Sequence, residues 1–214
     1  MSIYLKVYKI LLILLLSSCS GKNDNTENTR QAIPPSGSEG GVIQEFYLND
    51  TLNQQIASLK FSPEQDVWEI VIGEDYFRGI IKNGKRKFYT KTGETFAEVK
   101  FKDDGFKLRA PDGTLLWKIK LKDDKIKIGD REEMNDPYEL KIANSYYAKL
   151  IRDGEEHGSI TLNPDYSLAR VDGKAGNYTF AGRELTFSPA VMLIEEIPTI
   201  HQLIIMTQLI HEGR

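Results

Sequence analysis

The chain has 214 residues, with 28 basic and 31 acidic side chains and a formal net charge of −3. Its single cysteine excludes an intramolecular disulfide, so a folded domain must be held together by its core alone. The net acidic balance argues against nucleic acid as a partner, because nucleic-acid-binding domains carry strongly basic surfaces.

The start of the chain predicts a secretory signal peptide, residues 1–18. Lys6 and Lys9 precede an apolar run over residues 10–16, which is followed by small residues. This run is far shorter than the roughly 20 residues that a membrane-spanning helix needs. The segment is therefore expected to be removed.

The residues Leu16-Ser17-Ser18-Cys19 resemble the lipobox of bacterial lipoproteins. The resemblance implies cleavage before Cys19 and acyl chains, such as palmitate, on that residue, which anchor the protein to a membrane of the cell envelope. Two or more chains hold a protein stably at a membrane. Because Ser20 and not Asp follows the cysteine, the outer membrane is favoured in a Gram-negative organism. An uncleaved anchor, or an ordinary signal peptide with a chance cysteine, is the alternative.

Residues 19–41 are predicted to be the lipidated cysteine and a disordered tether. Residues 20–41 are rich in Asn, Ser, Gly and Pro and contain little that can be buried. Residues 42–214 have the length and composition of one folded domain.

The domain reads mainly as strands after one short predicted helix. That helix has Asp50 as its N-cap and Leu52, Ile56 and Leu59 as one apolar stripe. After Pro63, apolar and polar residues alternate, which predicts short strands of a barrel or a sandwich. The strands are residues 67–72, 76–81, 86–89, 95–101, 106–110 and 115–121, with later ones around Tyr138, Ile160 and Tyr178.

A ten-residue pattern occurs twice, at residues 99–108 and 119–128. Each copy predicts a hairpin, because paired aspartates stand at its centre, where turns favour them. Together the copies predict a four-stranded meander with one solvated face, on which the lysines lie. The apolar face comprises Val99, Phe101, Phe106, Leu108, Trp117, Ile119, Leu121, Ile126 and Ile128.

Residues 189–212 predict a C-terminal helix that is apolar nearly all round and is therefore buried. Pro198 is expected to kink this helix or to divide it into two pieces. A second membrane anchor is the alternative, although the uninterrupted apolar run at 203–210 is much too short to span a bilayer.

The repeated hairpins and the apolar C-terminal helix, over roughly residues 86–212, resemble the tubby C-terminal-like superfamily, which includes LURP-one-related proteins and phospholipid scramblases. The resemblance implies a mainly β fold, an antiparallel meander that closes into a β-barrel around the hydrophobic C-terminal helix. Members of the superfamily bind phosphoinositides or act at membranes, but a fold alone does not fix function. No phosphoinositide-binding motif is recognisable, so the resemblance assigns no residue a role.

Charge is distributed unevenly along the chain. Residues 82–127 hold 14 basic and 7 acidic side chains, a net of +7, whereas the rest of the chain after residue 18 is acidic. This predicts a cationic face that binds an anionic lipid or envelope polymer. The alternatives are lysines that serve solubility, and a structural or protein-interaction role with an unidentified protein partner. The residues of the face are Lys100, Lys102, Lys107, Arg109, Lys118, Lys120, Lys122, Lys125 and Lys127.

The sequence contains no catalytic or metal-binding motif that we recognise. His201 and His211 stand about 80° apart around a helix and share no ligand face, and His157 lies far from both in sequence. Glu195 and Glu196 are adjacent, so they point about 100° apart and do not form an acid–base pair by themselves. We therefore predict a non-enzymatic domain without metal or cofactor.

Overall fold

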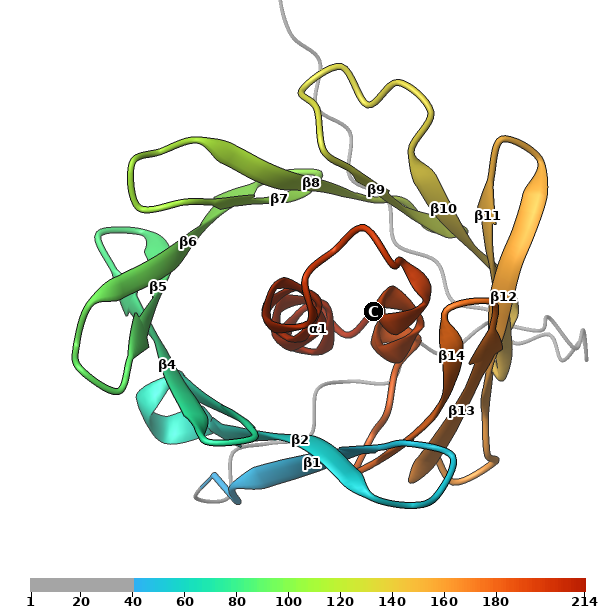
Figure 1. Cartoon of the computed structure of the whole chain (residues 1–214), viewed down its shortest axis with the longest axis horizontal. Helices are drawn as coiled ribbons and strands as arrows, with labels where there is room; N and C mark the ends of the chain where they lie inside the picture. Colours follow the sequence, from blue (N-terminus) through green and yellow to red (C-terminus); the bar gives the residue numbers. More distant parts are fainter. Residues whose placement is uncertain (1–40) are drawn as a thin grey trace, which may run out of the picture. The chain divides into compact units, whose positions relative to one another are not determined.

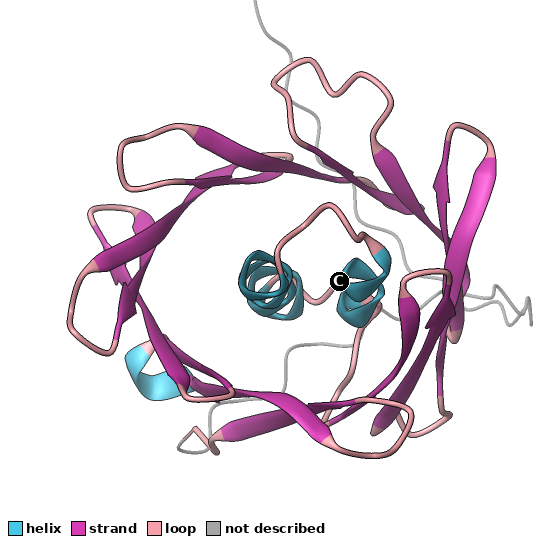
Figure 2. Cartoon of the chain, viewed as in Figure 1, coloured by secondary structure: helices cyan, strands magenta, loops and turns pink. Residues whose placement is uncertain are grey.

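A computed structural model describes residues 41–214. The predicted signal peptide, Cys19 and all but the last residue of the predicted tether lie outside the described residues. The described part of the chain is a closed antiparallel β-barrel of fourteen strands with a short α-helix at its C-terminal end (Figures 1 and 2). The predicted fold class is thus confirmed.

Each strand pairs with its neighbours in the chain, and β14 pairs with β1 to close the barrel. A closed meander has no free edge strand, which removes the risk of pairing with another chain. The strands are β1 (Gln44–Asn49), β2 (Gln55–Ser62), β3 (Val67–Ile72), β4 (Asp75–Lys82), β5 (Lys85–Thr90), β6 (Thr95–Lys102), β7 (Gly105–Arg109), β8 (Leu115–Leu121), β9 (Lys125–Gly129), β10 (Tyr138–Asn144), β11 (Tyr147–Arg152), β12 (Glu155–Leu162), β13 (Leu168–Gly173) and β14 (Gly176–Ala181).

The two sequence repeats form the hairpins β6–β7 and β8–β9, and the four strands are consecutive in the barrel. The predicted meander is therefore confirmed. Its apolar residues face the lumen, because side chains alternate between the two faces of a strand. Six of the nine are fully buried, and Phe101, Trp117 and Leu121 are half-buried against the same core.

The predicted helix at residues 50–59 is wrong, because this segment forms the turn between β1 and β2 and most of β2. The Asp50 carboxylate accepts hydrogen bonds from the backbone N–H groups of Leu52 and Gln54, both at 2.8 Å, and so stabilises a turn. Asn53 follows with a left-handed φ of 60°. Leu52 is 75% exposed in this turn, so the helical spacing of the apolar residues was fortuitous.

The C-terminal segment forms two pieces, the 3₁₀-helix η2 (Ser188–Leu193) and the α-helix α1 (Thr199–His211). A single helix over residues 189–212 is therefore wrong, whereas division at Pro198 is confirmed, since this proline is the N-cap of α1. Both pieces lie inside the barrel (Figure 2), and residues 202–209 are all buried. No helix among residues 41–214 has the length and apolar character of a membrane span.

Two glycines allow η2 to pack closely against the barrel wall. Gly158 of β12 and Gly173 of β13 are directly opposite each other, and a Cβ atom on either would come within 2.9 Å of the Leu193 side chain. The Gln202 side-chain amide then joins α1 to η2 by donating to the carbonyl oxygen of Ile194 at 2.9 Å. The remaining 3₁₀-helix, η1 (Pro63–Gln65), connects β2 to β3.

Candidate anion-binding face

The nine residues of the predicted cationic face all come from β6–β9 and the β8–β9 turn. Lys100 and Lys102 are exposed on β6, while Lys107 and Lys127 stand between fully buried neighbours and Lys118 stands between half-buried Trp117 and buried Ile119. Strand alternation therefore directs these basic side chains away from the lumen. The structure brings the predicted residues together on one outer surface of four adjacent strands.

Strand register aligns lysines directly opposite one another. Lys85 pairs with Lys100, Lys100 with Lys107, and Lys107 with Lys118. We call these four residues, which cross β5, β6, β7 and β8, the lysine row. Like charges directly opposite each other destabilise a sheet, so this arrangement carries an energetic cost.

A shorter row of like charge continues on the neighbouring strands, where Lys125 pairs with Lys141 and Lys141 with Lys149. Lys85, Lys141 and Lys149 were not among the predicted residues, because only the strand register shows that they extend the cationic surface. The Glu139 carboxylate forms ion pairs with Lys127 at 2.6 Å, Lys125 at 3.5 Å and Lys141 at 3.7 Å. This shorter row is therefore largely neutralised within the sheet.

Glu132 neutralises the end of the lysine row. It lies in the β9–β10 loop, residues 130–137, and its carboxylate reaches across β8 to contact Lys107 Nζ at 2.6 Å, Arg109 Nη2 at 3.2 Å and Lys118 Nζ at 3.4 Å. The Glu132 backbone carbonyl also accepts a hydrogen bond from Lys118. The hydrogen bond from Lys107, followed by that from Lys118, holds the pKa of Glu132 below its ordinary value.

Three residues of the cationic face have no ion pair with any of residues 41–214: Lys100, Lys102 and Lys122. The other six pair with Glu132, with Glu139 or, for Lys120 at 3.4 Å, with Asp104. Intramolecular carboxylates thus cover much of the face and leave its β6 edge and the β8–β9 turn open to an external anion.

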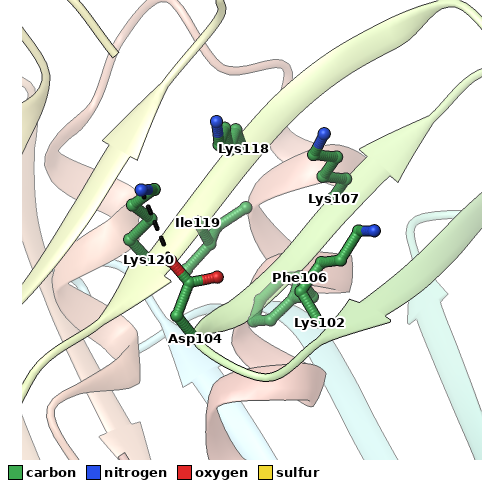
Figure 3. A pocket seen from close by; sticks show the side chains of 7 residues that line it. All are labelled: Lys102, Asp104, Phe106, Lys107, Lys118, Ile119 and Lys120. Atoms are coloured by element: carbon green, nitrogen blue, oxygen red, sulfur yellow. Dashed lines mark ion pairs between the residues drawn. The ribbon is translucent and has the colours of Figure 1, made fainter. Parts of the chain in front are cut away.

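A shallow hollow of about 180 Å³ lies over β6, β7 and β8 between the lysines. Gly105 stands between Lys102 and Lys120 in the cross-strand register, so no side chain fills the position between them. Its φ of +141° favours glycine, and a Cβ atom there would overlap the carbonyl oxygen of Ile119. Figure 3 shows four lysines around the hollow, with Asp104 joined to Lys120. The lining residues are Lys102, Asp104, Phe106, Lys107, Lys118, Ile119 and Lys120.

The three histidines lie apart, each against a different aromatic ring. His157 packs edge-on against Tyr138, with ring centroids 5.3 Å apart, while His201 and His211 each lie 5.7 Å from a phenylalanine ring. Within residues 41–214, no group of three or more His, Cys, Asp or Glu side chains could hold a metal ion. The face itself offers ammonium and guanidinium donors, whose chemistry is the binding of anions.

Glu196 takes part in a network of side chains with Tyr138, Arg152 and Asp136. Tyr138 donates to the Glu196 carboxylate at 2.6 Å, and Arg152 approaches it at 3.0 Å while also pairing with Asp136. The hydrogen bond from Tyr138 contributes most to lowering the pKa of Glu196. Glu195 does not share these bonds. The network joins β10 and β11 to the segment that precedes α1.

Comparison of the chain with protein-family models, with curated proteins and with solved structures finds no match. The resemblances to the lipobox and to the tubby C-terminal-like superfamily therefore stay predictions.

Proposed function

We propose that this protein is a lipoprotein, held to a membrane of the cell envelope through acylated Cys19, whose barrel binds the phosphate groups of anionic lipids through its cationic face. The observation that carries the proposal is the lysine row. Four lysines stand directly opposite one another on adjacent strands, although each such pair destabilises the sheet. Within the described residues, Glu98 pairs with Lys85 and Glu132 pairs with Lys107 and Lys118, so these carboxylates offset part of the repulsion and an anionic surface would offset the rest.

Solubility alone does not require a row of one charge. On the same barrel, Lys60, Glu69 and Arg78 are opposite one another across β2, β3 and β4, so the signs alternate. That alternating row gives a charged outer surface without repulsion. The contrast between the two rows favours binding over solubility.

The unpaired lysines set the expected strength of binding. A lysine near an anionic membrane contributes about 1 kcal/mol, so Lys100, Lys102 and Lys122 together contribute about 3 kcal/mol, or roughly a hundredfold in partitioning. The paired residues contribute less, because their carboxylate partners must first be displaced. Binding should weaken steeply with salt, since exposed charges are screened.

The test is vesicle flotation of the unacylated chain, residues 19–214 with Cys19→Ser. The chain should float with phosphatidylglycerol-containing vesicles at low salt and not with phosphatidylcholine vesicles. The triple variant Lys100→Gln, Lys102→Gln, Lys122→Gln should lose roughly a hundredfold in partitioning.

The matched control is Lys60→Gln, Arg78→Gln, Lys174→Gln, which removes the same formal charge from outside the cationic face. It should partition within about twofold of the unsubstituted chain. Failure of that chain to float with anionic vesicles, or equal losses in both triple variants, would exclude headgroup binding by this face and direct the search to a protein partner.

A further inference from the structure

The loop that carries Glu132 lies against the centre of the cationic face. The loop connects β9 to β10 and projects from the barrel wall between them (Figure 1). Asp136, near its end, is fixed by an ion pair of 3.0 Å to Arg152. Met134 and Asp136 both have left-handed φ values, 56° and 50°. The loop is thus attached to β11 through Asp136 and to the basic residues of β7 and β8 through Glu132.

Exposure differs between Glu132 and the cations it contacts. The Glu132 side chain is 44% exposed, whereas the side chains of Lys107 and Lys118 are each 16% exposed and that of Arg109 is 26% exposed. The carboxylate faces solvent, with the three cations beneath it. A solvated anion that reached these cations would have to displace the carboxylate.

The displacement can be treated as a competition between charges. A group attached to the same chain competes at an effective concentration, which is on the order of millimolar for a short linker. A phosphodiester carries one negative charge, as the carboxylate does, and so gains little by replacing it. A phosphomonoester carries about −1.5 to −2 at neutral pH and has three strong acceptor oxygens, which suit a cluster of three cations.

We infer that Glu132 is a built-in competitor for the cluster of Lys107, Arg109 and Lys118 and restricts that cluster to dianionic phosphate groups, such as phosphomonoester headgroups. The inference rests on the proposed function, because it concerns the selectivity of the same face. The unpaired lysines provide general attraction to an anionic surface, and the Glu132 cluster discriminates among its headgroups.

A purely structural role for Glu132 makes a different prediction. If the carboxylate only relieves repulsion between Lys107 and Lys118, its removal lowers the stability of the barrel and leaves headgroup preference unchanged. Headgroup preference is therefore the readout, and thermal unfolding of each variant checks that the barrel is folded.

The experiment uses the unacylated chain described above and vesicles that contain phosphatidic acid, a phosphomonoester, or phosphatidylglycerol, a phosphodiester. At pH 8 the unsubstituted chain should prefer phosphatidic acid by about fivefold or more, because one extra charge near the cluster contributes about 1 kcal/mol. The preference should shrink at pH 5.5, below the second phosphate pKa of about 6. Soluble glycerol 1-phosphate is added as a competitor for vesicle binding. Competition would mean that the free phosphomonoester binds the cluster, and no competition would mean that binding requires the lipid surface.

Glu132→Gln should raise binding to both kinds of anionic vesicle, by about fivefold for phosphatidylglycerol. Its preference for phosphatidic acid should be larger than that of the unsubstituted chain, because the extra phosphate charge then meets the three cations without a competing carboxylate. Glu133→Gln is the matched control, because Glu133 is exposed in the same loop and makes no ion pair with residues 41–214. It should behave like the unsubstituted chain.

Two results would overturn the inference and leave the proposed function standing: equal binding of the unsubstituted chain to both anionic vesicles, or equal headgroup preference in the Glu132→Gln and Glu133→Gln variants. Absence of binding to either vesicle, in the unsubstituted chain and in Glu132→Gln alike, would remove both the inference and the proposed function.

Discussion

Replacing Asp66 by Asn should destabilise the barrel by about 3 kcal/mol, because the buried guanidinium of Arg86 would lose its counter-charge. Arg86 lies on β5 with its side chain fully buried, and its Nη2 atom donates to Asp66 Oδ1 at 2.6 Å. Its Nε and Nη1 atoms have no hydrogen-bond partner within residues 41–214. Burial lowers the pKa of Arg86, and the Asp66 carboxylate opposes this shift.

The magnitude follows from the unequal burial of the two partners. Breaking a buried ion pair by removing one member costs about 3–5 kcal/mol, and the lower end applies here because the Asp66 side chain is 40% exposed. Asn is the suitable replacement, since residue 66 has a left-handed φ of 50°, which Asn tolerates and Ala does not. The substitution therefore tests charge and hydrogen bonding with little backbone strain.

Arg86→Met should change the stability of the barrel much less than Asp66→Asn does. It removes the buried charge together with the two unpaired donors, so stability should stay within about 1 kcal/mol of the unsubstituted protein. In the Arg86→Met background, Asp66→Asn should cost less than about 1 kcal/mol, because no buried charge remains to be stranded. The pair should thus show a coupling free energy of about 2 kcal/mol.

Urea unfolding of the four proteins, followed by tryptophan fluorescence, measures this cycle. The transition midpoint should shift while the denaturant dependence stays constant, which indicates that stability alone has changed. If Asp66→Asn unfolds within about 0.5 kcal/mol of the unsubstituted protein, or if the two substitutions are additive, Arg86 does not depend on Asp66 and the reasoning fails.

Three further changes test the interior. Gln202→Leu should cost about 2 kcal/mol in thermal unfolding, because the carbonyl groups of η2 lose a buried donor; an unchanged midpoint would contradict that role. Gly173→Ala should cost about 1–3 kcal/mol, since its Cβ atom would come within 2.6 Å of the Leu193 side chain; a neutral result would mean that η2 is loosely packed. Burial lowers the pKa of His201, so below about pH 6.5 this imidazole takes up a proton more readily in the unfolded chain than in the folded chain. Stability should fall between pH 7.5 and 5.5, and His201→Leu should remove its share of this loss in urea unfolding at the two pH values.

Much of the barrel could be predicted because its strands alternate cleanly between apolar and charged residues. The duplicated hairpins and the break at Pro198 are both determined by local sequence, through turn residues and the missing proline N–H. The β1–β2 hairpin was missed, since residues 50–59 also fit a helical spacing and Asp50 suits a helix N-cap as well as the turn that it forms. Burial of Arg86 had a signal, because it shares the inward parity of Phe88 on β5.

The nine predicted residues of the cationic face lie together, whereas the extension of the surface through Lys85, Lys141 and Lys149 and its pairing with carboxylates could not be predicted. Alternation places Lys107 and Lys118 on the outer surface, whereas their pairing with Glu132 depends on how the β9–β10 loop folds back across β8. The alignment of Lys85 with Lys100 depends likewise on strand register, which is set by the β5–β6 turn and the irregularity between Phe88 and Tyr89, and not by residues near either lysine. Contacts of this kind are long in sequence and short in space, so a reading of local patterns does not include them.

The packing of the lumen determines where the described domain can meet a ligand. Large barrels enclose more volume than their own side chains fill and commonly hold ligands inside. Here η2 and α1 occupy the lumen, and the buried amide of Gln202 donates to the carbonyl groups of η2. A ligand must therefore approach from the outer surface or the ends of the barrel. Because the lysine row extends over four adjacent strands, it matches an extended array of anions, such as a layer of headgroups, better than one small molecule.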